Sequence, residues 1–201
     1  MTTGLLIGLL ILITSIGLYA CKGRLKGNDK VNQDDNVKKT KVADNPYPEL
    51  RNQAINVTPD QLQLQLDNDN DIYGIVMDWN MGDAIATVIS FKTGDASVYL
   101  STGQVFIGGY AHETVINAAK QFVIAGEKYL SKSIQTENTE PTDEKKVDFY
   151  FLTKSGKYYI EDDFTNIENN TSDLLGLFEA GNQVITEYRL ITDKKQQRTI
   201  E

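Results

Sequence analysis

Three segments rich in β-branched residues follow one another between residues 72 and 102, and they restrict the fold more than any other feature of the sequence. The segments read IYGIVMDW, AIATVISF and ASVYLST, and only the four-residue turns NMGD and KTGD separate them. Parallel neighbours need a crossover of a dozen or more residues, so strands joined by such short turns are antiparallel. The sequence therefore predicts a three-stranded antiparallel meander, which residues 104–107 extend or bulge.

Two amphipathic helices and a hairpin are predicted after the meander. Residues 112–131 carry apolar side chains at helical spacing, namely Val115, Ala119, Phe122, Gly126 and Tyr129. The segments VDFYFLTK and KYYIEDD flank Ser155-Gly156, which predicts a tight hairpin. The second helix covers residues 173–191, with Thr171 or Ser172 as its cap.

The predicted elements have the order β-β-β-α-β-β-α. We expect an α+β fold in which a five-stranded antiparallel sheet carries both long helices on one face. This order resembles that of profilin-like and roadblock-like domains. The segments GIVMDW, ATVISFKTGDASVYLSTG, IGG and LFEAGNQVITEYRL also look like those of uncharacterised bacterial proteins without an assigned activity. That resemblance implies a shared domain over residues 72–109 and 177–190 and transfers no site residues.

Residues 1–21 are predicted to form a transmembrane anchor. The uncharged run GLLIGLLILITSIGLYA at 4–20 would span roughly 25 Å as a helix, close to the thickness of a bilayer core. Basic residues follow this run and none precedes it, so the positive-inside rule predicts a single-pass cell-membrane protein with a cytoplasmic domain. The alternative is a lipoprotein that faces the envelope. Leu18-Tyr19-Ala20-Cys21 resembles a bacterial lipobox, which would make Cys21 the lipidation site, although Tyr19 is bulky for that motif.

Residues 22–57 are predicted to be a flexible polar linker, and residues 58–201 a single domain. The linker is rich in Lys, Asn, Asp and Gly as far as about residue 45. Thr58 and Gln61 form a capping-box pattern, which predicts the start of a helix. The alternation in QLQLQL, residues 61–66, equally permits a strand.

Charge and composition argue against three classes of ligand. Residues 22–51 hold eight basic and five acidic residues, a net charge of +3, whereas residues 52–201 hold 12 basic and 23 acidic residues, a net charge of −11. An acidic domain repels nucleic acid and anionic lipid, so we expect neither as a ligand of the domain, although the basic stretch after the apolar run can lie against anionic headgroups. The chain has one cysteine and one histidine, too few for an ordinary Cys/His zinc site.

The alternating aspartates of LDNDNDIYGIVMDW raise the question of a cation site. Asp67, Asp69 and Asp71 match the first acidic positions of an EF-hand loop. The sixth position is Ile72 where that loop needs glycine, and the twelfth is Asp78 where it needs glutamate. We therefore interpret the segment as a solvated turn before a strand, with a surface cation site as the alternative.

Two places are candidates for acid–base chemistry. Asp78, next to Trp79, ends the first strand, where its carboxylate would serve either a reaction or the following turn. His112 and Glu113 begin the long helix after Gly108-Gly109, where free N–H groups favour anions. The glycine and lysine spacings of a P-loop or a dinucleotide site are missing, so we expect no cofactor.

Aromatic residues are the candidates for contact with a protein partner: Trp79, Tyr150 and Tyr158. Alternation places Tyr150 on the face of its strand opposite Phe149 and Phe151, and its aromatics would form a binding surface if no helix covers that face. We therefore expect a membrane-tethered, non-enzymatic interaction or regulatory domain. The alternative is a membrane-bound enzyme that acts on a small molecule through Asp78 or His112.

Overall fold

The computed structural model describes residues 45–141 and 145–200. The predicted anchor at 1–21, with Cys21, and residues 22–44 of the predicted linker lie outside the described residues. Within the described part, no helix is long and apolar enough to cross a bilayer. The anchor, the lipidation site and the orientation across the membrane therefore stay predictions.

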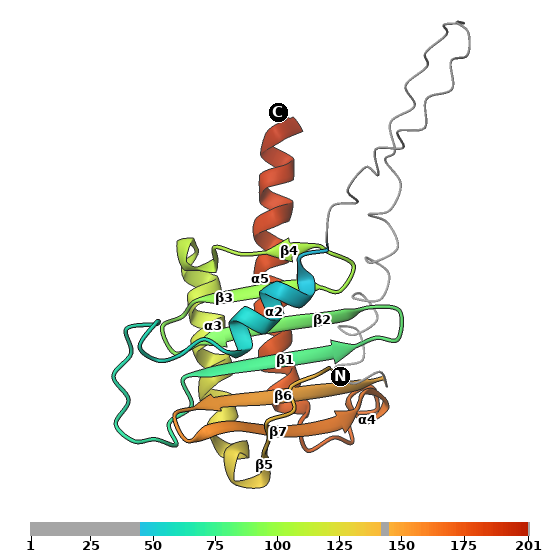
Figure 1. Ribbon diagram of the computed structural model, residues 1–201. Coiled ribbons are helices and arrows are strands. Elements are labelled where there is room, and N and C mark those ends of the chain that lie inside the picture. The colour runs from blue at the N-terminus through green and yellow to red at the C-terminus, as the bar shows by residue number, and fades with distance from the viewer. Residues whose placement is uncertain (1–44, 142–144, 201) are drawn as a thin grey trace, which may run out of the picture. The chain divides into compact units, whose positions relative to one another are not determined.

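Seven strands and four α-helices form the described part of the chain (Figure 1). The strands are β1 (Gly74–Asn80), β2 (Ile85–Phe91), β3 (Ala96–Leu100), β4 (Val105–Phe106), β5 (Ile134–Gln135), β6 (Lys146–Thr153) and β7 (Gly156–Asp163). The α-helices are α2 (Tyr47–Ile55), α3 (Glu113–Gly126), α4 (Phe164–Glu168) and α5 (Leu175–Ile200). Two 3₁₀ helices flank α3, namely η1 (Gly109–Ala111) and η2 (Glu127–Lys132).

The strands form one antiparallel sheet in the order β4-β3-β2-β1-β6-β7-β5. The predicted number of five strands is wrong, because β4 and β5 each add a strand at one edge. Both contain two residues, too few to show the alternation by which a strand is recognised. The predicted meander is confirmed as β1, β2 and β3, and the predicted hairpin about Ser155-Gly156 as β6 and β7.

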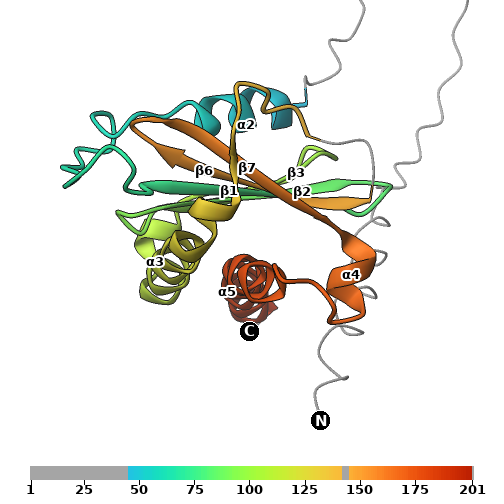
Figure 2. The same cartoon turned by 90° about the horizontal axis from the view of Figure 1, so that it is seen from below.

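Helices α3 and α5 lie on the same face of the sheet, as Figure 2 shows. The buried side chains on α3 include Val115, Ala119 and Phe122, three of the positions predicted from helical spacing. Gly126 allows α3 to approach the strands closely, because a Cβ there would overlap Ile75 and Phe151. Helix α5 continues to Ile200, beyond its predicted end at residue 191.

Helix α2 covers the opposite face, which the predicted fold left open (Figure 2). The Asn45 side chain accepts a hydrogen bond from the Tyr47 amide at 3.0 Å, and Pro46 precedes the first helical residue. Tyr47 and Ile55 then join the apolar cluster on that face of the sheet. Since α2 lies within residues 22–57, the folded part starts at Asn45, ahead of the predicted start at Thr58.

The predicted start of a helix at Thr58 forms its capping bonds but no helix. The Gln61 side chain accepts from the Thr58 amide at 2.8 Å, and the Gln61 amide donates to the Thr58 hydroxyl at 3.3 Å. Gln63 then adopts a left-handed φ of 54°, which ends the turn. Residues 61–66 form neither helix nor strand, and their leucines pack against the cluster beneath α2.

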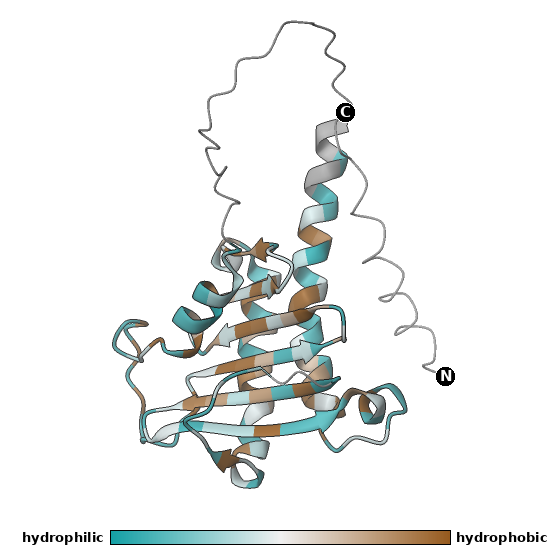
Figure 3. Ribbon diagram, turned by 45° about the vertical axis from the view of Figure 1, so that its right-hand side comes forward, coloured by the Kyte–Doolittle hydropathy of each residue, from teal (hydrophilic) through white to brown (hydrophobic). Residues whose placement is uncertain are grey.

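The central strands are buried on both faces because helices cover the sheet from both sides. Nearly every residue of β1, β2 and β6 is buried. Figure 3 shows the hydrophobic residues along these strands and the hydrophilic residues in the long loops. A polar side chain in the middle of such a sheet needs a partner inside the protein.

Candidate functional site

Asp78 lies near the end of β1 and is only 1% exposed. Alternation along the strand places it on the α2 face, together with Val76. The register sets it opposite Thr87 on β2 and opposite Asp148 on β6. Burying one carboxylate beside another is costly, so the partners of Asp78 decide its role.

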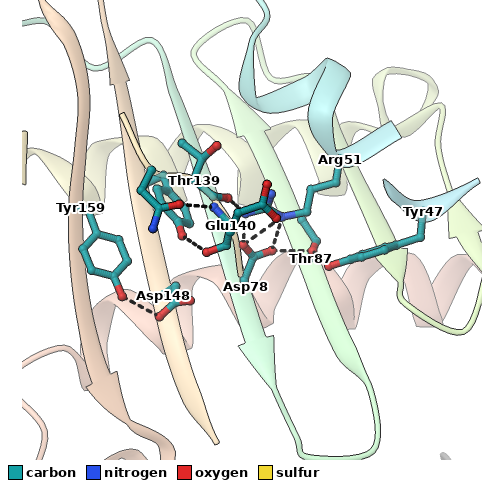
Figure 4. Close-up of polar contacts among 10 residues, drawn as sticks. Tyr47, Arg51, Asp78, Thr87, Thr139, Glu140, Asp148 and Tyr159 are labelled. Carbon is teal, nitrogen blue, oxygen red and sulfur yellow. Dashed lines mark hydrogen bonds and ion pairs between the residues drawn. The ribbon is translucent and has the colours of Figure 1, made fainter. Parts of the chain in front are cut away.

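Arg51, on α2, supplies the opposite charge and is 6% exposed (Figure 4). Its Nε lies 3.2 Å from Oδ1 and 3.0 Å from Oδ2 of Asp78, and its Nη2 lies 2.5 Å from Oδ2. The Thr87 hydroxyl donates to Oδ1 at 2.5 Å. An ionised carboxylate has about four acceptor sites. Three donors of the same chain, the Nε and Nη2 of Arg51 and the Thr87 hydroxyl, thus occupy both oxygens of Asp78 and most of these sites.

Further hydrogen bonds extend from this pair to a segment that crosses over the sheet. The hydroxyls of Tyr47 and Thr87 lie 3.0 Å apart. Arg51 Nη2 also donates to the carbonyl of Thr139 at 2.6 Å, and the Tyr150 hydroxyl donates to the carbonyl of Glu140 at 3.1 Å. The Arg51 guanidinium lies 5.7 Å from the centre of the Tyr150 ring. We call Tyr47, Arg51, Asp78, Thr87 and Tyr150 the buried polar network.

Burial favours the neutral forms of Tyr47, Arg51 and Tyr150. It raises the pKa of Tyr150, and the negative charges of Asp148 and Asp78 raise it further. Burial and the charge of Asp78 likewise raise the pKa of Tyr47. Burial opposes the charged form of Arg51, but its hydrogen bonds with Asp78 outweigh this effect and raise the pKa of Arg51. At neutral pH the phenols are therefore neutral and the guanidinium is charged.

A second buried carboxylate, Asp148, lies beside the network and is also 1% exposed. The Tyr159 hydroxyl donates to its Oδ1 at 3.1 Å and also bonds to Glu161 (Figure 4). Lys146 pairs with Glu161 at 3.0 Å. The hydrogen bond from Tyr159 and the positive charge of Lys146 lower the pKa of Glu161, although partial burial opposes this change.

The geometry favours a structural role for Asp78. A general base needs a carboxylate oxygen that reaches its substrate, whereas the oxygens of Asp78 bind Arg51 and Thr87 beneath α2. The turn after β1 is served by Asn80, whose side-chain oxygen accepts from the Gly82 amide at 2.8 Å. The network fastens α2 and residues 139–140 to the sheet.

The aromatic candidates take three different positions. Trp79 points to the face opposite Asp78, where its ring centre lies 5.0 Å from that of Phe164 and 5.2 Å from that of Phe178. Tyr150 is 1% exposed because α2 and its neighbours cover its face. Tyr158 is half-buried in β7, with its hydroxyl near that of Ser155. Neither Trp79 nor Tyr150 therefore offers a surface to a partner.

The aspartates before β1 form a turn. The Asp71 carboxylate accepts hydrogen bonds from the amides of Asp67 and Asn68, at 3.0 and 3.3 Å. The carbonyl of Asp69 accepts from the Ser155 amide at 3.0 Å, which ties the turn to the β6–β7 hairpin. Among the residues that the structure describes, no three His, Cys, Asp or Glu side chains gather as a metal site would require.

His112 and Glu113 lie at the start of α3, away from the buried polar network. Glu113 is exposed in the first helical turn. His112 lines a groove of about 220 Å³, together with Val105, Phe106, Ile107, Tyr188, Ile191 and Thr192. Strands β2 and β3 separate β1 from β4 in the sheet, so the structure does not bring His112 to Asp78.

Exposed apolar side chains gather next to this groove. Val105, Ile107 and Tyr110 are 38%, 65% and 72% exposed, and together we call them the β4 edge. The sequence did not predict this surface, because residues 104–107 were expected to extend or bulge the third strand and not to form an edge strand of their own. The run VFIGGY could have indicated this surface, because it holds more apolar side chains than a two-residue strand can bury.

The β4 edge and the buried polar network are thus the two features of the described residues that bear on function. Comparison of the chain with protein-family models, with curated proteins and with solved structures finds no match. The function is therefore argued from the residues of this chain alone.

Proposed function

We propose that the chain is a membrane-tethered interaction domain, without an enzymatic role, that lies on the cytoplasmic side of the membrane. The β4 edge is the observation that carries the proposal. It presents Ile107 and Tyr110 to solvent beside a groove, and exposed apolar groups of this kind mark contact surfaces. The basic flank after residues 4–20 supports the membrane tether and its orientation.

The buried polar network supports an interaction role over the alternative of an enzyme. Asp78 is one of the two catalytic candidates, and its carboxylate binds Arg51 and Thr87. His112 shares its groove mainly with apolar side chains and lies on a different part of the sheet. A domain that binds a surface needs exposed side chains, and the β4 edge provides them.

Two measurements on the full chain in bacterial cells test the proposal. Protease treatment of intact and opened spheroplasts should digest the domain only after opening, whereas digestion from outside contradicts the cytoplasmic orientation. A photo-cross-linking residue at position 110 should capture a neighbouring macromolecule or lipid. The same residue at Ile134 is the control, since Ile134 is 66% exposed on β5 at the opposite edge. Equal yields at both positions would contradict a contact surface at the β4 edge.

The enzyme alternative is tested at Asp78, because Asp78 lies in the buried polar network, away from the β4 edge. Asp78→Asn should leave the cross-linking yield at position 110 unchanged as long as the domain stays folded. If the folded variant abolishes the cross-link, Asp78 matters beyond structure, and the proposal of a plain contact surface fails.

A further inference from the structure

We infer that the β4 edge docks on the anionic surface of the bilayer to which the chain is tethered. The inference rests on the proposed membrane tether and adds the partner of the β4 edge. Three observations on different residues support it: where the chain enters the domain, which side chains are exposed along that edge of the sheet, and how charge is distributed along α5.

The chain enters the domain at the same edge of the sheet. The Asn45 side-chain amide donates to the carbonyl of Ser101 at 2.7 Å, in the turn between β3 and β4. A Cβ at Gly103, in the same turn, would lie 3.3 Å from Asn45 Oδ1. The predicted tether is therefore joined to the domain beside the turn that leads into β4, so the chain that connects this edge to the predicted anchor is the shortest for this part of the sheet.

The exposed side chains at this edge suit the region of the lipid headgroups. Tyr110 carries an aromatic ring with a polar tip, the kind of side chain that is enriched at membrane interfaces. Ile107 and Val105 add apolar surface next to it. Among the residues that the structure describes, the opposite edge exposes Ile134 alone in this way and has no comparable cluster.

Charge along the chain favours an anionic surface at the projecting end of α5. Residues 189–201 hold four basic and two acidic residues, a net charge of +2. Residues 52–188 hold eight basic and 21 acidic residues, a net charge of −13, and are repelled by an anionic surface, so docking requires that the basic end of α5 faces the lipid. Figure 1 shows α5 continuing past β4, so the basic end of this helix lies beyond the same edge. The β4 edge itself carries no acidic residue, and the acidic residue nearest to it in sequence is Glu113.

The predicted tether makes weak docking sufficient. The 23 residues from 22 to 44, if they behave as the polar linker that their composition predicts, have an end-to-end distance of about 25 Å. A short tether of this kind gives an effective concentration on the order of millimolar. Anionic lipids attract basic residues only within about 8 Å at physiological salt, and the tether holds the domain close enough for that attraction to act. A second copy of the chain is the rival occupant, but it explains neither the entry point nor the basic end of α5.

The test uses the full chain in nanodiscs that contain phosphatidylserine and lipids brominated on their acyl chains. Ile107→Trp places a fluorophore on the β4 edge, and Ile134→Trp is the control of almost equal exposure at the opposite edge. The native Trp79 is buried and gives the same background in both variants. We expect the emission of Ile107→Trp to fall with brominated lipid and that of Ile134→Trp to stay constant. Replacing phosphatidylserine by phosphatidylcholine, or adding Lys194→Glu and Lys195→Glu, should remove the loss of emission, whereas Lys120→Glu and Lys154→Glu should not.

Each other result overturns the inference in a recognisable way. Equal quenching at both positions means that the domain has no preferred face toward the lipid. A blue shift of Ile107→Trp without quenching by bromine means that protein, such as a second copy, covers the edge. Absence of both changes in a chain that remains in the nanodisc removes the docking but keeps the tether. A chain that fails to enter nanodiscs contradicts the proposed function itself, and that outcome is separate from the others.

Discussion

Replacing Arg51 by methionine removes the charge that compensates Asp78 while keeping a side chain of similar length. The substitution deletes the three short contacts with the carboxylate and the hydrogen bond to the Thr139 carbonyl. Asp78 would stay 1% exposed and opposite Asp148 on the next strand. Removing one partner of a buried ion pair costs about 3–5 kcal/mol. The loss is a large share of the roughly 5–15 kcal/mol that stabilises an ordinary domain.

Urea unfolding of the full chain in detergent micelles measures this loss. Trp79 is the only tryptophan, it is 4% exposed, and its emission reports the packing of the opposite face of the sheet. Lys146→Met is the matched control, because it breaks the outer pair with Glu161 and should cost about 0–1 kcal/mol. The double variant Arg51→Met/Asp78→Leu should recover most of the lost stability, since it leaves no buried charge from the pair. A single variant no worse than the control, or a double variant as unstable as the single one, would refute the argument.

Three further predictions concern other parts of the fold. Tyr188 donates to the Ala96 carbonyl at 2.6 Å, and burial raises the pKa of Tyr188 to about 12. The stability that this group contributes is therefore complete below about pH 10 and is lost as the pH rises toward 12. Tyr188→Phe should flatten that alkaline loss in urea titrations followed by tyrosinate absorbance. Gly126→Ala should cost about 1–3 kcal/mol in the same unfolding assay, because the new methyl group overlaps Ile75. Tyr159→Phe should return the pKa of Glu161 toward its usual value of about 4.3, which carboxyl NMR measures. In the native chain, the stability linked to Glu161 is present above about pH 4.3 and is lost as the pH falls below it. An unchanged titration of Glu161 would show that Tyr159 is not the main cause of the shift.

The long elements were predictable because each repeats a simple pattern over seven or more residues. Runs of β-branched residues between short turns revealed β1, β2 and β3, the Ser155-Gly156 turn between two apolar segments revealed β6 and β7, and helical spacing revealed α3 and α5. Helix α2 escaped notice because it has nine residues in a polar region, and because the prolines just before it and in its first turn, Pro46 and Pro48, are also typical of extended chain. The spacing of Tyr47, Leu50 and Ala54, after an Asn-Pro start, was the signal that would have revealed it.

The partners of Asp78 could not be predicted, although its place at the end of a strand could. Arg51 precedes Asp78 by 27 residues. Arg51 also binds the carbonyl of Thr139, which lies 88 residues after Arg51. No local pattern specifies contacts over such separations, because they depend on the order of strands in the sheet and on the face that each strand turns to α2. Without the missed helix, the Tyr150 face looked open, and its aromatics looked available to a partner.

The arrangement of α2 also fixes an order of events during synthesis on the ribosome. This helix emerges first among the described elements, yet Asp78, Thr87 and Thr139 must follow before its contacts with them form. A nine-residue helix is unstable alone in water. Tyr47 and Ile55 of the nascent chain therefore lack part of their native contacts until the ribosome has added some 90 residues beyond α2. Packing of α2 on this face of the sheet is thus a late step of folding.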